Sequence, residues 1–205
     1  FPHECAEQTF HRYYANALAR HIAQSDPEIR RVFDQWRNTP ALDSPLAKNS
    51  DLKGILLEET PWLREANDES QARRKVGLLF DANLLDSQLE RNLWQLKQMQ
   101  RPDGLWPWFQ GGEGNETISL GIAAGFARLR AFGVATDITP ALKCLQALDR
   151  CLTERHAAIL RRAEKDPAVL DQCHLDPAVA YYLYTRTFFL KDKAVAKPHQ
   201  DAVNF

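Results

Sequence analysis

Cys5 and Gln8 stand three residues apart at the start of an amphipathic run over residues 9–22. Positions i and i+3 of a helix are neighbours, so a helix beginning here would bring the thiol and the carboxamide together. Attack of the Cys5 sulfur on the Gln8 carboxamide would release ammonia and leave an internal thioester, which is an acyl donor awaiting a nucleophile. The spacing therefore permits a single-use acyl transfer.

A helix N-terminus would support both the making and the opening of this bond, because its free N–H groups favour a thiolate and stabilise a negative acyl oxygen. Glu4 and Glu7 partly oppose that field, and Glu7 either orients the Gln8 amide or is solvated. The structural alternative is that Cys5 is a small buried hydrophobe near a helix start.

The segment CAEQ at residues 5–8 resembles the Cys-x-Glu-Gln thioester signature of the alpha-2-macroglobulin and complement family, which an aromatic residue and a proline often precede, as here. The longer string PHECAEQTFHRYYANALARHIA is similar to the opening of the thioester domain in bacterial, Bacteroidetes-type alpha-2-macroglobulins. Further similar blocks are LLEETPW at 56–62, RRKVGLLFDANLL at 73–85 and PDGLWPWFQGG at 102–112. The resemblance thus covers most of the chain.

The resemblance implies a fold and a function. Thioester domains of this family are α/α toroids, which are rings of helical hairpins, and a complete one is longer than 205 residues. We therefore expect residues 1–205 to form the N-terminal part of such a domain, excised from a larger protein. The implied function is broad-spectrum inhibition of proteases (endopeptidases), which are trapped covalently when their lysine amines open the Cys5–Gln8 thioester. The implied location is the periplasm, the outer membrane or the extracellular space.

A thioester needs cover from water, and aromatic residues are the candidates for such a shield. The six candidates are Phe1, Tyr13, Tyr14, Trp106, Trp108 and Phe109. Their alternative role is ordinary core packing. In the family a neighbouring domain of the same protein supplies part of the shield and leaves when a protease cuts a bait segment.

The acyl acceptor is also suggested by the resemblance. Complement members use a histidine about a hundred residues downstream of the thioester, but residues 114–125 contain none and offer Asn115, Glu116 and Thr117 instead. The family logic then favours direct attack by lysine amines. Such a protein is an inhibitor and not a turnover enzyme, and it needs no cofactor.

Two alternatives stay open. One is a helical toroid without a thioester that acts as a scaffold or binding surface. The other is a relative of terpenoid cyclases or prenyltransferases, because Gln100, Asp103, Gly104 and Trp106 fit the Gln-x-x-Asp-Gly-x-Trp pattern of toroidal cyclases. That pattern occurs once, and the acidic catalytic run of a cyclase is missing.

The composition indicates what kind of protein this is and which partners and sites it gives no reason to expect. The 205 residues are 44% hydrophobic and 26% charged, which is ordinary for a globular domain. A net charge of -1 gives no reason to expect nucleic acid as a partner. The four cysteines are too few for a disulfide framework, and the Cys and His residues lack the short spacing of a structural metal site.

Helical periodicity and capping residues predict an all-α protein. The expected helices cover residues 6–23, a segment beginning at Pro27, then 45–57, 69–100, 116–131, about 140–165 and 178–190. Asp26, Asp176 and either Asp137 or Thr139 are expected at helix starts, and Gly133 at a helix end. Residues 105–115 are rich in Gly and Trp and are expected to form a loop.

Overall fold

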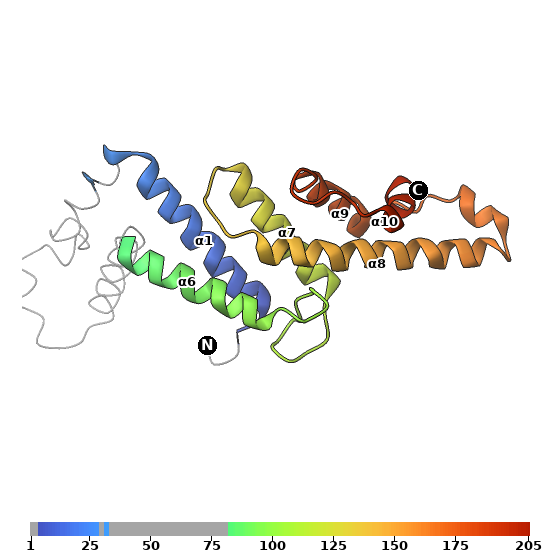
Figure 1. The fold of residues 1–205 in the computed structure, drawn as a ribbon, viewed down its shortest axis with the longest axis horizontal. Coiled ribbons are helices and arrows are strands. Elements are labelled where there is room, and N and C mark those ends of the chain that lie inside the picture. The colour runs from blue at the N-terminus through green and yellow to red at the C-terminus, as the bar shows by residue number, and fades with distance from the viewer. Residues whose placement is uncertain (1–3, 29–30, 33–81) are drawn as a thin grey trace, which may run out of the picture. The chain divides into compact units, whose positions relative to one another are not determined.

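The computed structural model describes residues 4–28, 31–32 and 82–205 (Figure 1). This part of the chain forms six α-helices and one 3-10 helix. They are α1 (Ala6–Ser25), α6 (Ala82–Met99), α7 (Glu116–Ala131), α8 (Thr139–Ala163), η2 (Pro167–Asp171), α9 (Pro177–Thr187) and α10 (Lys197–Asn204). Residues 45–57 and 69–81, where further helix was expected, lie outside the described ranges, as does most of the segment after Pro27.

The chain divides into two compact units. One contains the chain up to Tyr14 together with Arg91–Phe205, and the other contains Ala15–Glu90. The first unit contains the Cys5 region, the loop at residues 105–115 and the helices α7 to α10. In the second, Asn16 Nδ2 donates to Gln88 Oε1 over 3.1 Å, and Arg20 Nε lies 2.7 Å from Asp86 Oδ1.

α7 is the central helix of the first unit. It packs against α8 and α9, and α8 in turn contacts η2, α9 and α10, which lie along it in Figure 1. Ten of the sixteen residues of α7 are buried. A helix that is apolar on most of its circumference is the kind that sits inside a core. Ile122, Phe126 and Leu129 are at most 2% exposed and form its apolar centre.

Local capping sets the ends of these helices. Asn115 Oδ1 accepts the Ile118 N–H over 2.9 Å at the start of α7. At its end Gly133 adopts φ 77°, and the Gly133 and Val134 N–H groups bond to Arg130 O (2.9 Å) and Leu129 O (3.0 Å). These two bonds form a Schellman motif, which favours glycine because of the positive φ. The predicted range 116–131 is therefore confirmed.

The expected caps at Asp26 and Asp176 are also confirmed, because Asp26 Oδ1 accepts the Glu28 N–H at 2.8 Å and Asp176 Oδ1 accepts the Val179 N–H at 2.8 Å. At α8, Thr139 is the first helical residue and Ile138 is the N-cap, and Asp137 Oδ1 accepts the Thr139 N–H at 2.9 Å from just outside the helix. α1 runs two residues past the predicted Ala23, and α8 ends at Ala163, short of 165. η2 and α10 were not predicted.

A buried ion pair joins α8 to α9. Arg186 Nε donates to Asp149 Oδ1 over 3.1 Å, and the Tyr182 hydroxyl donates to the same oxygen over 2.5 Å. All three residues are at most 3% exposed. Burial and the bond to the Asp149 carboxylate raise the pKa of Tyr182 above its ordinary value, so the tyrosine stays a proton donor.

The described residues are all-α, and Pro107 and Gly114 form their only β-bridge. None of the described helices has the length and apolarity required to cross a bilayer.

Candidate functional site

Cys5 and Gln8 form a reciprocal cap at the start of α1. Cys5 precedes the first helical residue, and Gln8 is the third residue of the helix. The Gln8 N–H donates to Cys5 Sγ over 3.4 Å, while Gln8 Oε1 accepts the Cys5 N–H over 3.3 Å. This is a capping box in which a thiol occupies the place usually taken by a Ser or Thr hydroxyl. The side chain of each residue thus contacts the backbone of the other across one turn.

The two members of the cap differ in exposure. Cys5 is 5% exposed, whereas Gln8 is an exposed residue. The sulfur is therefore on the interior side of the turn, and the carboxamide is on the solvent side. The Glu4 carboxylate forms an ion pair with Arg12, which reduces the negative charge that it adds next to the thiol.

Aromatic packing holds this end of α1 against α7. The centroids of the Phe10 and Phe126 rings are 5.1 Å apart, and those of the Tyr13 and Phe126 rings are 5.7 Å apart. The Tyr13 hydroxyl also shares a 2.5 Å hydrogen bond with Thr136 Oγ1. These contacts fix the helix face that lies one and two turns after Cys5.

The loop at residues 105–115 makes a second attachment. The first N–H groups of a helix have no acceptor within the helix. At the start of α1 the Ala6 N–H donates instead to Trp108 O over 3.0 Å. Trp106 anchors this loop: its backbone N–H donates to Ser119 Oγ over 2.7 Å, and its indole N–H donates to Leu96 O over 2.8 Å. The loop backbone that contacts Ala6 is therefore tied to both α6 and α7.

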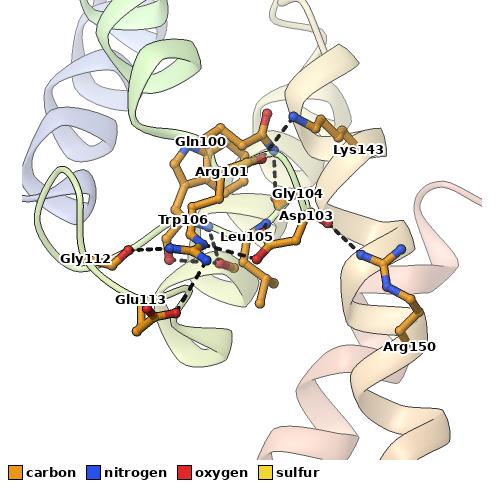
Figure 2. A network of polar contacts seen from close by, with 11 residues as sticks. Gln100, Arg101, Asp103, Gly104, Leu105, Trp106, Gly112, Glu113, Lys143 and Arg150 are labelled. Atoms are coloured by element: carbon orange, nitrogen blue, oxygen red, sulfur yellow. Dashed lines mark hydrogen bonds and ion pairs between the residues drawn. The ribbon is translucent and has the colours of Figure 1, made fainter.

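Charged side chains fix the near end of the same loop (Figure 2). Arg101 Nη1 donates to Gly112 O over 2.8 Å and its Nε donates to Asp103 Oδ2 over 3.1 Å. From α8, Lys143 Nζ donates to Arg101 O at 3.0 Å, and Arg150 Nη2 donates to Asp103 O at 2.6 Å. Partial burial acts to raise the pKa of Asp103, but the Leu105 N–H and the two arginines together lower it below the ordinary value.

Gln100 and Gly104, from the cyclase-like pattern, have structural contacts. Gln100 Nε2 donates to Gly104 O (2.8 Å) and Pro140 O (2.9 Å), which links the end of α6 to the turn and to α8. Gly104 adopts φ 103°, and a Cβ there would lie 2.6 Å from Lys143 O. Only glycine fits this turn without strain. All four pattern residues therefore tie the loop to its neighbouring helices.

The six candidate shield residues fall into different environments. Trp106 is 0% exposed and Tyr13 is 4% exposed, so both belong to the core, which was their alternative role. Trp108 and Phe109 are 50% and 54% exposed, and Tyr14 is half-buried. Phe1 lies outside the described residues. Of the loop aromatics, Trp108 is the residue whose backbone carbonyl contacts the start of α1.

The three candidate acyl-transfer residues have contacts of their own. Asn115 caps α7, Glu116 Oε2 accepts from Arg155 Nη2 over 2.8 Å, and Thr117 is exposed. Asn115 and Glu116 therefore have structural roles: Asn115 caps α7, and Glu116 links α7 to α8 through Arg155.

The other cysteines are all free thiols. Cys144 is fully buried and donates to Ser119 O, and burial raises its pKa well above the ordinary value. Cys173 is exposed, and Cys151 is half-buried. Among the described residues no three His, Cys, Asp or Glu side chains are grouped as a metal site would require.

Two features of the site were missed by reading the sequence. The capping role of Gln8 follows from the same spacing that suggested a thioester, because Cys-x-x-Gln matches the capping-box pattern with a thiol in the first place. The contact between Ala6 and Trp108 had no local signature, because about a hundred residues separate the partners.

Comparison of the chain with protein families, with curated proteins and with solved structures finds no significant match in any of the three.

Proposed function

We propose that this chain is the N-terminal part of a thioester domain of a bacterial alpha-2-macroglobulin-like protease inhibitor. The observation that carries the proposal is the reciprocal contact of Cys5 and Gln8 in the first turn of α1, at 3.3 and 3.4 Å. The described residues contain helices and no strands, which is compatible with an α/α toroid. The excision from a larger protein, the neighbouring domains and the periplasmic or extracellular location are parts of the same proposal and rest on the sequence resemblance.

The thioester forms by an acyl substitution. The Cys5 sulfur attacks the Gln8 side-chain carbonyl carbon, the carbon–nitrogen bond breaks, and ammonia leaves with the thiol proton. No oxidant or cofactor is needed. The first-turn N–H groups stabilise negative charge on the acyl oxygen and on the sulfur. The Gln8 N–H already contacts Cys5 Sγ and is the donor that would stabilise the leaving thiolate.

Opening of the bond is a single event. A lysine amine of a protease attacks the acyl carbon from the exposed Gln8 side, the carbon–sulfur bond breaks, and the Cys5 thiolate takes up a proton. The product is an amide between inhibitor and protease. Asn115 caps α7, and Glu116 accepts a hydrogen bond from Arg155, so neither side chain is free to act as a general base. We therefore expect the lysine amine to attack directly. Turnover is excluded because the acyl group is consumed.

The second candidate function is a thioester-less toroid that serves as a scaffold or binding surface. It is favoured by the capping box, which stabilises the start of α1 whether or not the thioester forms. A cyclase-like enzyme has less support, because the Gln100 and Trp106 side chains are committed to holding the loop.

Two conservative variants separate chemistry from capping. Cys5→Ser keeps the cap because serine is a preferred N-cap residue, and Gln8→Glu keeps it because Glu serves equally at the third position. Neither variant retains the thiol–carboxamide pair. The full-length protein should have an intact mass lower than its sequence by one ammonia, and methylamine should add to it. Both variants should have their full sequence mass and remain unreactive. Full sequence mass and no methylamine uptake in the unmodified protein would favour the scaffold.

A further inference from the structure

One ion pair spans the first two turns of α1. Arg12 Nη2 pairs with Glu4 Oε1, although Arg12 lies about 9 Å along the helix axis from Ala6, the first helical residue. Long side chains of a helix point back toward its N-terminus and cover the turn that precedes them. The Arg12 side chain therefore runs over the turn that contains Gln8 to reach Glu4.

Arg12 also shares a helix face with the capping pair. Residues at positions i, i+3 and i+7 lie along one side of a helix, and here they are Cys5, Gln8 and Arg12. The Arg12 side chain is 51% exposed, whereas that of Glu4 is 15% exposed. The guanidinium is therefore the outer member of the ion pair, on the side of the turn where the Gln8 carboxamide is open to solvent.

Two backbone donors of this turn are already occupied. The Ala6 N–H donates to Trp108 O over 3.0 Å, and the Gln8 N–H donates to Cys5 Sγ over 3.4 Å. The first serves the loop and the second serves the sulfur, so neither is left for the oxygen of an acyl group. A guanidinium has five N–H donors, and the ion pair of Arg12 is made through Nη2. No described residue accepts a hydrogen bond from its Nε or Nη1.

We propose that Arg12 stabilises the negative acyl oxygen when the thioester opens, and that Glu4 positions Arg12 for this role; the inference rests on the proposed thioester function. When an amine attacks the Gln8 acyl carbon, the carbonyl oxygen becomes negative and accepts a hydrogen bond from the guanidinium. The carbonyl then reforms as the carbon–sulfur bond breaks. Arg12 transfers no proton, because a guanidinium stays protonated. The charges of Glu4 and Arg12 cancel, so the contribution is this short-range hydrogen bond and not a long-range attraction.

The test measures how fast methylamine opens the thioester in the full-length protein, from intact mass against time. Arg12→Gln should open about tenfold more slowly, a smaller loss than that of a fully buried oxyanion donor. Arg12→Lys should recover part of the rate because it keeps the charge but not the planar fork of donors. Glu4→Gln should slow opening by about threefold, as expected for an exposed ion pair that only positions Arg12. Arg31→Gln is the matched control, because Arg31 forms an exposed ion pair with Glu28 outside the site, and it should open at the unmodified rate.

The mass of each protein before methylamine separates this inference from the thioester itself. Faster opening of Arg12→Gln would overturn the role of Arg12, because the side chain would then shield the acyl group. A rate equal to that of Arg31→Gln would overturn it too, and in both cases a mass deficit of one ammonia would leave the thioester function standing. A deficit lost in Arg12→Gln at an unchanged thermal midpoint, but kept in Arg12→Lys, would support the role, because the same oxygen is negative while the bond forms. Full sequence mass in the unmodified protein would overturn the thioester function and this inference with it.

Discussion

The Phe10 ring lies directly against the backbone of Gly125. A Cβ built on Gly125 would stand 2.2 Å from Phe10 Cε1 and 2.3 Å from Cζ, distances that no real Cβ adopts. The absence of a side chain at Gly125 lets α1 approach α7 closely, five residues after Cys5. This contact and the Ala6–Trp108 hydrogen bond together determine where the first turn of α1 lies.

Replacement of Gly125 by Ala should therefore destabilise the protein by about 1–3 kcal/mol, because the Phe10 ring must move and the core is overpacked. Gly121 is the matched control: it lies one turn earlier on α7, and a Cβ added there would meet no atom within 4 Å. Gly121→Ala should stabilise by up to about 1 kcal/mol through helix propensity. Urea unfolding measures both.

A rescue experiment tests the cause. Phe10→Leu in the Gly125→Ala background should recover part of the lost stability, because the smaller side chain leaves room for the new methyl group. If Gly125→Ala and Gly121→Ala have the same free energy of unfolding, the proposed close approach is wrong.

The turn at Gly104 provides a second comparison. Gly104 and Gly111 both adopt positive φ, 103° and 84°, but only Gly104 faces a backbone atom, Lys143 O at 2.6 Å. Gly111→Ala should lower the free energy of unfolding by about 1–2 kcal/mol, because alanine is strained at this positive φ. Gly104→Ala should cost at least about 1 kcal/mol more because α8 must also shift. Thermal unfolding of the two variants measures the difference, and equal costs would contradict it.

The buried Asp149–Arg186 pair should be one of the most sensitive sites in the described structure. Asp149→Ala leaves the Arg186 guanidinium and the Tyr182 hydroxyl without their buried acceptor, which should cost about 3–5 kcal/mol. Asp192→Ala removes the partner of Arg130 at a more exposed pair and should cost less than about 1 kcal/mol. Denaturant midpoints compare them. A loss at Asp149 as small as that at Asp192 would mean that the buried charge is solvated.

Asp137 should make stability depend on acid pH. The hydrogen bond from Lys97, at 2.7 Å, and that from Thr139 lower the pKa of Asp137 to about 2. A lowered pKa stabilises the fold above the unfolded-state value of about 3.9, and this contribution is lost as pH falls from about 4 to about 2. Lys97 and Asp137 are 44% and 37% exposed, so solvent screening limits the effect to less than about 1 kcal/mol.

Asp137→Asn is the appropriate variant because its amide oxygen still caps the Thr139 N–H. The thermal midpoint of the variant should fall less between pH 4 and pH 2 than that of the unmodified chain. Parallel curves over this range would show that Asp137 does not contribute.

Local interactions explain which parts of the fold were predictable. Asp176 and Gly133 mark helix ends because each acts on backbone groups within a few residues, so their sequence positions suffice. The reciprocal cap at Cys5 and Gln8 is local for the same reason. The first helix and the range 116–131 were accordingly predicted to within two residues.

Non-local contacts explain what was missed. The Phe10–Gly125 contact joins residues more than a hundred positions apart, and no periodicity reveals it. In the sequence Asp149 and Arg186 resemble ordinary solvated charges on amphipathic helices, although both are buried in the structure. α10 was missed because Lys197–Asn204 is short and carries few apolar residues.

The most direct test of the thioester is peptide mapping of the full-length protein after methylamine treatment and thiol alkylation. We predict that the tryptic peptide ending at Arg12 has a methylamide at Gln8 and an alkylated Cys5, and that without methylamine Cys5 resists alkylation even in denaturant, provided that hydrolysis is prevented. An unmodified Gln8 carboxamide together with a Cys5 that alkylates in denaturant without amine would contradict the thioester.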